Sequence, residues 1–172
     1  MPKRRRPTKP KTRISLRDRF LIVAFLILLF LGDTSGHSPS YQEKAVAAVL
    51  MGEAWGEGTI GMTAVGEVIR ERANRLKRTP LRIVTTGKNG YHAFSCLNGT
   101  HIDALITKFQ KAPEYKKALE ISRMVCRYPS QLPGITQGAT HFVISTEIPY
   151  WAEGYEPVAI IGAHAFYRLP WI

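Results

Sequence analysis

The chain has 172 residues and a formal charge of +11, which suits one modest domain with an appendage. Residues 1–19 hold nine Lys/Arg against one Asp, whereas fifteen Lys/Arg from His37 onward face eleven Asp/Glu. The basicity is therefore concentrated in the tail, and without a nucleic-acid-binding motif this argues against a specific nucleic-acid partner. The mildly basic remainder suits an anionic polymer such as a bacterial cell wall.

Residues 20–36 follow this tail and include an uncharged run at 20–32. A run of this length is shorter than the ~20 residues of a spanning helix, and the order of basic region, apolar core and small residues is typical of a secretory signal. Cleavage near Gly36 and retention as a membrane anchor both remain open. Either way, we expect a cytoplasmic tail (1–19), a signal or anchor segment (20–36) and an exported domain (37–172) in the periplasm or cell envelope. The alternative is a disordered tail on a cytosolic protein.

The first predicted helix covers 38–58. Ser40 with Glu43 three positions later forms a capping box. Its apolar face is predicted from the i, i+3, i+4, i+7, i+11 spacing of Val46, Val49, Leu50, Glu53 and Glu57. Glu53 therefore continues an apolar stripe rather than a solvated face.

A carboxyl that loses hydration stays neutral more readily, and a neutral carboxyl can protonate a glycosidic oxygen. Glu53 is thus a candidate general acid, and the alternative is a structural ion pair with Arg70 or Arg72. Glu57 lies on the same side of the helix, which makes it a poor nucleophile for the opposite face of a sugar. Its expected role is to hold the helix end or a nearby group.

A second helix is expected from a cap at Thr59 to the "RLKR" cluster before Pro80, with an apolar side that includes Ile60 and Leu76. Residues 85–101 are predicted to be loop-rich, and a third helix is predicted at 113–126. Residues 138–145 and 157–168 are predicted to be two strands. The predicted fold class is α+β, helical at the front with a small β-element near the C-terminus.

The remaining site candidates are individually weaker. Aromatic rings such as Trp55 and Trp151 suit sugar faces, although such rings are as often part of the core. His141 and His164 fall on predicted strands, where a histidine is usually structural. Ser95 lies outside any Gly-x-Ser-x-Gly elbow.

The two cysteines of the chain could in principle bind a metal or form a disulfide. No Cys-x-x-Cys or Cys/His cluster is present, so we expect neither a metal nor another cofactor. In an exported protein Cys96 and Cys126 are candidates for a disulfide, and free buried thiols are the alternative. Nothing in the sequence indicates an oligomeric state.

Four blocks of sequence together resemble the cell-wall hydrolase family typified by spore-cortex-lytic enzymes. The first is "VLMGEAWGEGTIGMTAVGEVI", which is similar to the family's Gly-Glu-Ala-Arg-Gly-Glu run and the helix after it. The others follow in order: "FSC" at 94–96, "GATHFV" at 138–143, and Trp151 with "IGAHAFYR" at 161–168. The resemblance covers nearly all of residues 41–168.

This resemblance implies a lysozyme-like α+β domain that cleaves peptidoglycan glycan strands between N-acetylmuramic acid and N-acetylglucosamine. The activity would be that of a lytic transglycosylase or a muramidase. The first Glu of the signature corresponds to Glu53. Substrate contacts are expected from the other matched blocks, at Trp55, Glu57, Phe94, Ser95, His141, Trp151 and His164.

The sequence also departs from the family pattern. Trp55 replaces the signature Arg, and the family's Asn-Arg pair becomes Glu71-Arg72 unless Asn74-Arg75 takes its place. A short domain behind a signal segment suits a phage endolysin or a stand-alone envelope enzyme. Two other functions remain open: an inactive wall-binding relative, and a basic membrane-attached protein that binds an anionic polymer through residues 1–19.

Overall fold

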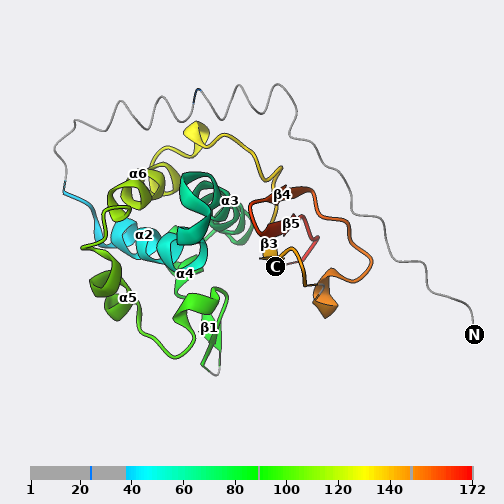
Figure 1. The fold of residues 1–172 in the computed structure, drawn as a ribbon, viewed down its shortest axis with the longest axis horizontal. Coiled ribbons are helices and arrows are strands. Elements are labelled where there is room, and N and C mark those ends of the chain that lie inside the picture. The colour runs from blue at the N-terminus through cyan, green and yellow to red at the C-terminus, as the bar shows by residue number, and fades with distance from the viewer. Residues whose placement is uncertain (1–23, 25–37, 89, 148, 172) are drawn as a thin grey trace, which may run out of the picture.

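The computed structural model describes residues 24, 38–88, 90–147 and 149–171. The predictions for residues 1–19, and those for 20–36 apart from Ala24, lie outside the described residues. Within the described part of the chain, no helix combines the length and apolar character needed to cross a membrane. Helices gather on one side of the domain in Figure 1, and a three-stranded sheet lies beside α3.

The labelled α-helices are α2 (Tyr41–Ala54), α3 (Gly58–Leu76), the short α4 (Pro80–Val84), α5 (Ile102–Phe109) and α6 (Tyr115–Cys126). Short 3₁₀ turns are η1 (Trp55–Glu57), η2 (Ser95–Leu97), η3 (Pro129–Gln131) and η4 (Tyr150–Ala152). The strands are β1 (Gly87–Lys88), β2 (Tyr91–His92), β3 (His141–Ile144), β4 (Ala159–Ile161) and β5 (His164–Tyr167).

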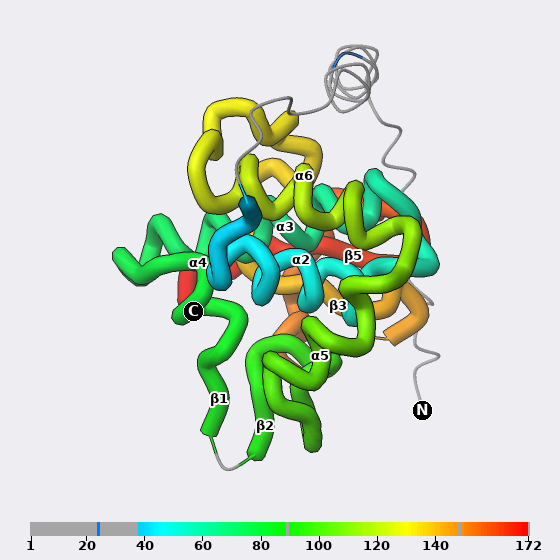
Figure 2. Tube along the Cα trace, turned by 90° about the vertical axis from the view of Figure 1, so that its left-hand side faces the viewer, coloured from blue at the N-terminus to red at the C-terminus, as the bar shows by residue number. Residues whose placement is uncertain are grey.

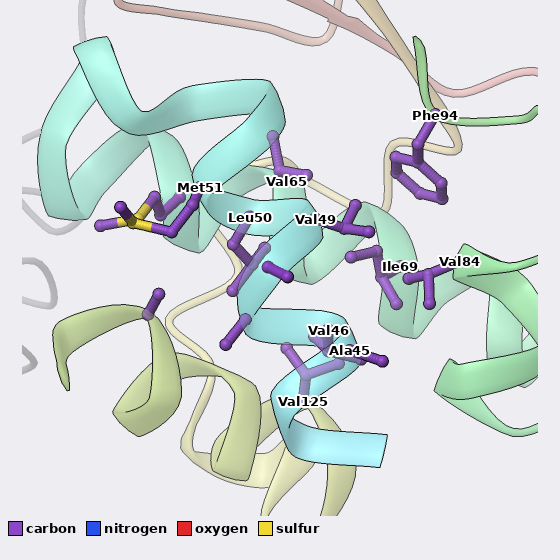
Figure 3. Packing of buried hydrophobic residues seen from close by; sticks show 14 of the residues in the cluster. Ala45, Val46, Val49, Leu50, Met51, Val65, Ile69, Val84, Phe94 and Val125 are labelled. Carbon is purple, nitrogen blue, oxygen red and sulfur yellow. The ribbon is translucent and has the colours of Figure 1, made fainter. Parts of the chain in front are cut away.

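The central helix of the core is α2. It begins as predicted: Ser40 Oγ accepts the Glu43 N–H, and the Glu43 carboxylate accepts the Ser40 N–H at 2.8 Å. Every side chain from Ala45 to Met51 is buried, since α3, α4, α5 and α6 all pack against this helix. The apolar stripe predicted from the sequence is therefore too narrow, and Figure 3 shows Val46, Val49 and Leu50 among residues of the surrounding elements.

Helix α3 differs from its prediction at its start, whereas it ends within the predicted "RLKR" cluster. It begins at Gly58 without a side-chain cap, so the cap predicted at Thr59 is wrong. Ile60 and Leu76 are partly exposed rather than buried, because they lie near the two ends of the helix. The buried residues of α3 fall between them, from Gly61 to Ala73. The helix ends at Lys77, whose left-handed conformation (φ 51°) closes the last turn.

The middle of the chain contains elements that the sequence did not indicate. The loop-rich stretch includes an antiparallel hairpin of β1 and β2, which projects from the body in Figure 2, and it ends before the unpredicted helix α5. Helix α4 was also missed. Helix α6 confirms the third predicted helix.

The sheet has the antiparallel order β3-β5-β4. The first predicted strand is confirmed as β3, but the second, at 157–168, is a hairpin that turns at Gly162 (φ +57°) into β5. The sheet packs on α3 through Ala64 and Val68, which share a cluster with Phe166 and Ile161. The predicted α+β class is confirmed.

Candidate active site

The carboxyl group of Glu53 lies where the last turn of α2 meets the η2 loop. Its Oε1 accepts the Cys96 backbone N–H at 2.8 Å, and the Ser95 hydroxyl donates to the same carboxylate at 3.2 Å. Glu53 is half-buried. The expectation that the apolar stripe would surround it with water-free, apolar side chains is therefore wrong. The cause is that this turn of α2 faces polar backbone of the loop rather than another apolar helix.

Close packing holds the η2 loop against α2. A Cβ on Gly52 would lie 2.6 Å from Cys96 Cβ and 2.9 Å from its Sγ, so only glycine permits this approach. Two residues before Cys96, the loop is anchored by the side chain of Phe94, a residue that is only 1% exposed. The loop is therefore positioned on both sides of the N–H that reaches Glu53.

A buried arginine, Arg72, interacts electrostatically with this carboxylate. Arg72 of α3 donates from Nε to the Thr140 carbonyl at 2.6 Å, and its guanidinium carbon lies 5.4 Å from the Phe94 ring centroid. Burial lowers the pKa of Arg72 to about 10, and the negative charge of Glu53 acts in the opposite direction. The sequence offered Arg72 only as a structural partner of Glu53, and its contact with strand β3 was not foreseen.

Glu57 is directed to a different part of the domain. Its Oε2 accepts the Ala163 backbone N–H at 2.9 Å, in the turn between β4 and β5. A Cβ on Gly162 would overlap the same carboxylate, so the turn fits closely around it. This contact agrees with the expected holding role of Glu57, whereas no substrate contact follows from it.

Trp55 lies at the exposed end of α2 and retains 47% of its accessible surface. Its ring packs edge-on against Phe109 of α5, with centroids 5.9 Å apart, and Lys108 Nζ lies 5.1 Å from the Phe109 centroid. The residue that departs from the family pattern thus forms an aromatic surface between η1 and α5.

The two predicted strand histidines lie on opposite faces of the sheet, because neighbouring residues of a strand alternate between faces. On one face His141 packs on Trp151 with centroids 5.2 Å apart, and on the other His164 packs edge-on against Phe142 at 5.5 Å. Phe142 also meets Phe94, 6.3 Å away between centroids, which connects the second face to the loop that contacts Glu53. Burial, with Arg72 and Arg75 nearby, lowers the pKa of His141 to about 4.

Glu67 is a buried carboxylate that the sequence reasoning did not single out. It accepts backbone N–H groups of Gly134, Ile135 and Thr136 and the Thr136 hydroxyl, at 2.6 to 3.1 Å. Burial raises the pKa of Glu67, and these four donors oppose the shift. A glutamate in the middle of an otherwise apolar helix face, beside Gly66 and Val68, is the sequence signal that was available.

Both cysteines are free thiols in the structure. Cys96 packs on Gly52, whereas Cys126 forms a side-chain hydrogen bond with Gln42. Gly52 and Gln42 are ten residues apart on α2, about 15 Å along a helix axis, while a disulfide needs Cα atoms within ~7 Å. The free-thiol alternative thus describes this structure.

Among the residues that the structure describes, no set of three or more His, Cys, Asp or Glu side chains is arranged to hold a metal ion.

A comparison with protein families identifies a family for this chain. A model described as Cell Wall Hydrolase matches residues 56–167, which is more than half of the chain. The chain belongs to the cell wall hydrolase family. The recognised family and its lysozyme-like α+β fold are thereby confirmed, and the chain is a cell wall hydrolase that degrades peptidoglycan. Searches of curated proteins and of solved structures found no match.

The matched region includes the Glu57 contact, Arg72, the η2 loop and the aromatic residues of strands β3 and β5. Glu53 lies three residues before it. The assignment of a role to Glu53 therefore depends on its position in the structure and on the sequence resemblance, in addition to family membership.

Proposed function

We propose that this cell wall hydrolase cleaves the glycan strands of peptidoglycan between N-acetylmuramic acid and N-acetylglucosamine, with Glu53 as the general acid. The observation that carries the proposal is the position of Glu53. It is a half-buried carboxyl whose Oε1 is fixed by the Cys96 N–H at 2.8 Å, beside an exposed tryptophan. A fixed carboxyl with access to solvent can reach a sugar bridge, whereas Glu43 and Glu67 are fully engaged inside the domain.

The proposed reaction begins with proton transfer from Glu53 to the glycosidic oxygen, while the bond from that oxygen to C1 of the muramic sugar breaks. The N-acetylglucosamine unit leaves as an alcohol, and C1 acquires oxocarbenium character. The 6-hydroxyl of the same muramic sugar then bonds to C1, and its proton passes to the Glu53 carboxylate. The product is a 1,6-anhydro end, and Glu53 is regenerated as the acid.

This lytic transglycosylase route is preferred to hydrolysis because of Glu57. A retaining or inverting glycosidase uses a second carboxylate across the sugar, and the other glutamate of the motif is committed to the Ala163 N–H. A transglycosylase requires only one carboxylate, since the nucleophile belongs to the substrate. We further propose that the domain acts outside the cytoplasm, exported through residues 20–36, since its substrate is there.

The test is a digest of purified sacculi with the full-length chain, followed by mass spectrometry of the released fragments. We expect wild type to release fragments with anhydro-muramyl ends, and Glu53→Gln to lower the rate about 100-fold or more, as expected for a general acid. Glu71→Gln is the matched control, because the contact that the structure describes for Glu71 is an ion pair with Arg75 on the same helix.

Three outcomes would contradict the proposal. Undiminished cleavage by Glu53→Gln would remove its assigned role. Reducing muramic ends would replace the transglycosylase by a muramidase. Binding to sacculi without any released fragment would indicate an inactive wall-binding relative.

A further inference from the structure

Arg72 of α3 connects the sheet region to the loop that contacts Glu53. Its Nε binds the Thr140 carbonyl at the start of β3, and its guanidinium lies over the ring of Phe94. Phe94 in turn precedes the two residues, Ser95 and Cys96, that donate to Glu53. A single side chain of α3 therefore contacts both the sheet and the loop that positions the carboxyl.

The charge of Arg72 acts on Glu53 in a partly dry environment. Arg72 is 9% exposed, and interactions between charges are stronger where water is excluded. The attraction between the two groups is strong enough to act on the pKa of Arg72, in the direction opposite to burial.

Other titratable groups around this pair contribute less charge. Burial and the Glu53 charge raise the pKa of the Cys96 thiol, which is therefore neutral. His141 of β3, with a pKa lowered to about 4, is neutral above that pH. Lys108 of α5 acts on Cys96, but it is exposed and screened by solvent. Glu57, on η1, is bound to the Ala163 N–H.

We propose that Arg72 is a positioning residue for the reaction, which holds the η2 loop against Glu53 and stabilises the Glu53 carboxylate formed when the proton leaves. This inference rests on the proposed role of Glu53. In the cycle above, the carboxylate exists between proton donation and proton recovery. A fixed cation that attracts the carboxylate favours that state without contact with the substrate.

The experiment measures the pH dependence of kcat/KM on solubilised glycan strands for the full-length wild type, Arg72→Met and Arg72→Lys. An acid catalyst must be protonated, so activity falls on the alkaline limb as it ionises. Without the cation, ionisation requires higher pH, and we expect the alkaline limb of Arg72→Met to move up by about 1 pH unit. Arg72→Lys keeps the charge, and its limb should stay near that of wild type.

A merely structural arginine would lower the rate at every pH without moving this limb. An unmoved limb in folded Arg72→Met would therefore overturn the inference, as would a limb in Arg72→Lys displaced as far as in Arg72→Met. Circular dichroism establishes folding, and if Arg72→Met is unfolded, Arg72→Gln replaces it, because its amide N–H can still reach toward Thr140. If Glu53→Gln retains activity, the proposed function fails first. If Glu53→Gln is inactive and the limb is unmoved, only the role of Arg72 fails.

Discussion

The carboxylate of Glu57 accepts a hydrogen bond from the backbone N–H of Ala163, 106 positions later in the chain, at 2.9 Å. The neighbouring Gly162 makes this approach feasible, since a Cβ there would lie 1.6 Å from Oε2 and 2.7 Å from Cδ of Glu57. The turn between β4 and β5 is thereby attached to the end of α2, next to the residue proposed for catalysis.

We expect Gly162→Ala to destabilise the domain by about 2 kcal/mol more than Gly154→Ala. Both glycines have positive φ, +57° and +81°, so both substitutions cost about 1 kcal/mol of backbone strain. Only at Gly162 does the added methyl group meet the Glu57 carboxylate, while at Gly154 nothing lies within 4 Å. Urea denaturation gives both free energies of unfolding, and equal values would show that the turn is not held by Glu57.

A second prediction concerns the glycine beneath the η2 loop. Gly52→Ala places a methyl group 2.6 Å from Cys96 Cβ, and the loop must move away from Glu53. Because displacement of about 1 Å at a reacting group can cost on the order of 100-fold in rate, we expect a loss of this order in fragment release from sacculi. Helix propensity offsets part of the stability cost, by ~1 kcal/mol.

Gly56→Ala is the control for Gly52→Ala, because a Cβ there meets nothing within 4 Å. It should retain activity near that of wild type. If Gly52→Ala cleaved sacculi as fast as Gly56→Ala, close packing of the loop would have no part in the reaction.

The third prediction is a pH dependence of stability from His141. Its pKa is about 4 in the folded domain and 6.5 ordinarily, so between these values the unfolded chain binds more protons. Stability therefore rises with pH in this window: the contribution of His141 is complete above about 6.5 and is lost as pH falls toward 4. The free energy of unfolding of wild type, compared with His141→Gln across this range, isolates the effect from that of Glu67, whose raised pKa has the opposite sign. A constant difference between the two proteins would contradict it.

The parts of the fold set by nearby residues were predictable from sequence. The capping box of Ser40 and Glu43 requires only residues three apart, and the structure has it. The helix at 113–126 has a clear apolar period and is confirmed as α6. Helix α5 was missed because it is short, at Ile102–Phe109, and follows a stretch rich in turn residues.

The parts that depend on distant backbone were not predictable. The 157–168 segment reads as one strand, but Glu57 and the left-handed Gly162 divide it into a hairpin. Likewise, the partners of Glu67 are backbone N–H groups nearly seventy positions away. For Glu53, the residue was identified, while its polar partners at Ser95 and Cys96 follow only from the packing of the loop on Gly52.

The contacts made by Glu57, Glu67 and Arg72 share one property: each reaches main-chain atoms of the C-terminal half, at Ala163, at 134–136 and at Thr140. Every amino acid carries a carbonyl, and all but proline carry an N–H. Apart from Gly162 and the Thr136 hydroxyl, these attachments do not depend on which side chain the bonded residue carries, so those side chains are free to diversify during evolution. Such an architecture would let related enzymes adapt to chemically different walls while the join between the two halves stays the same.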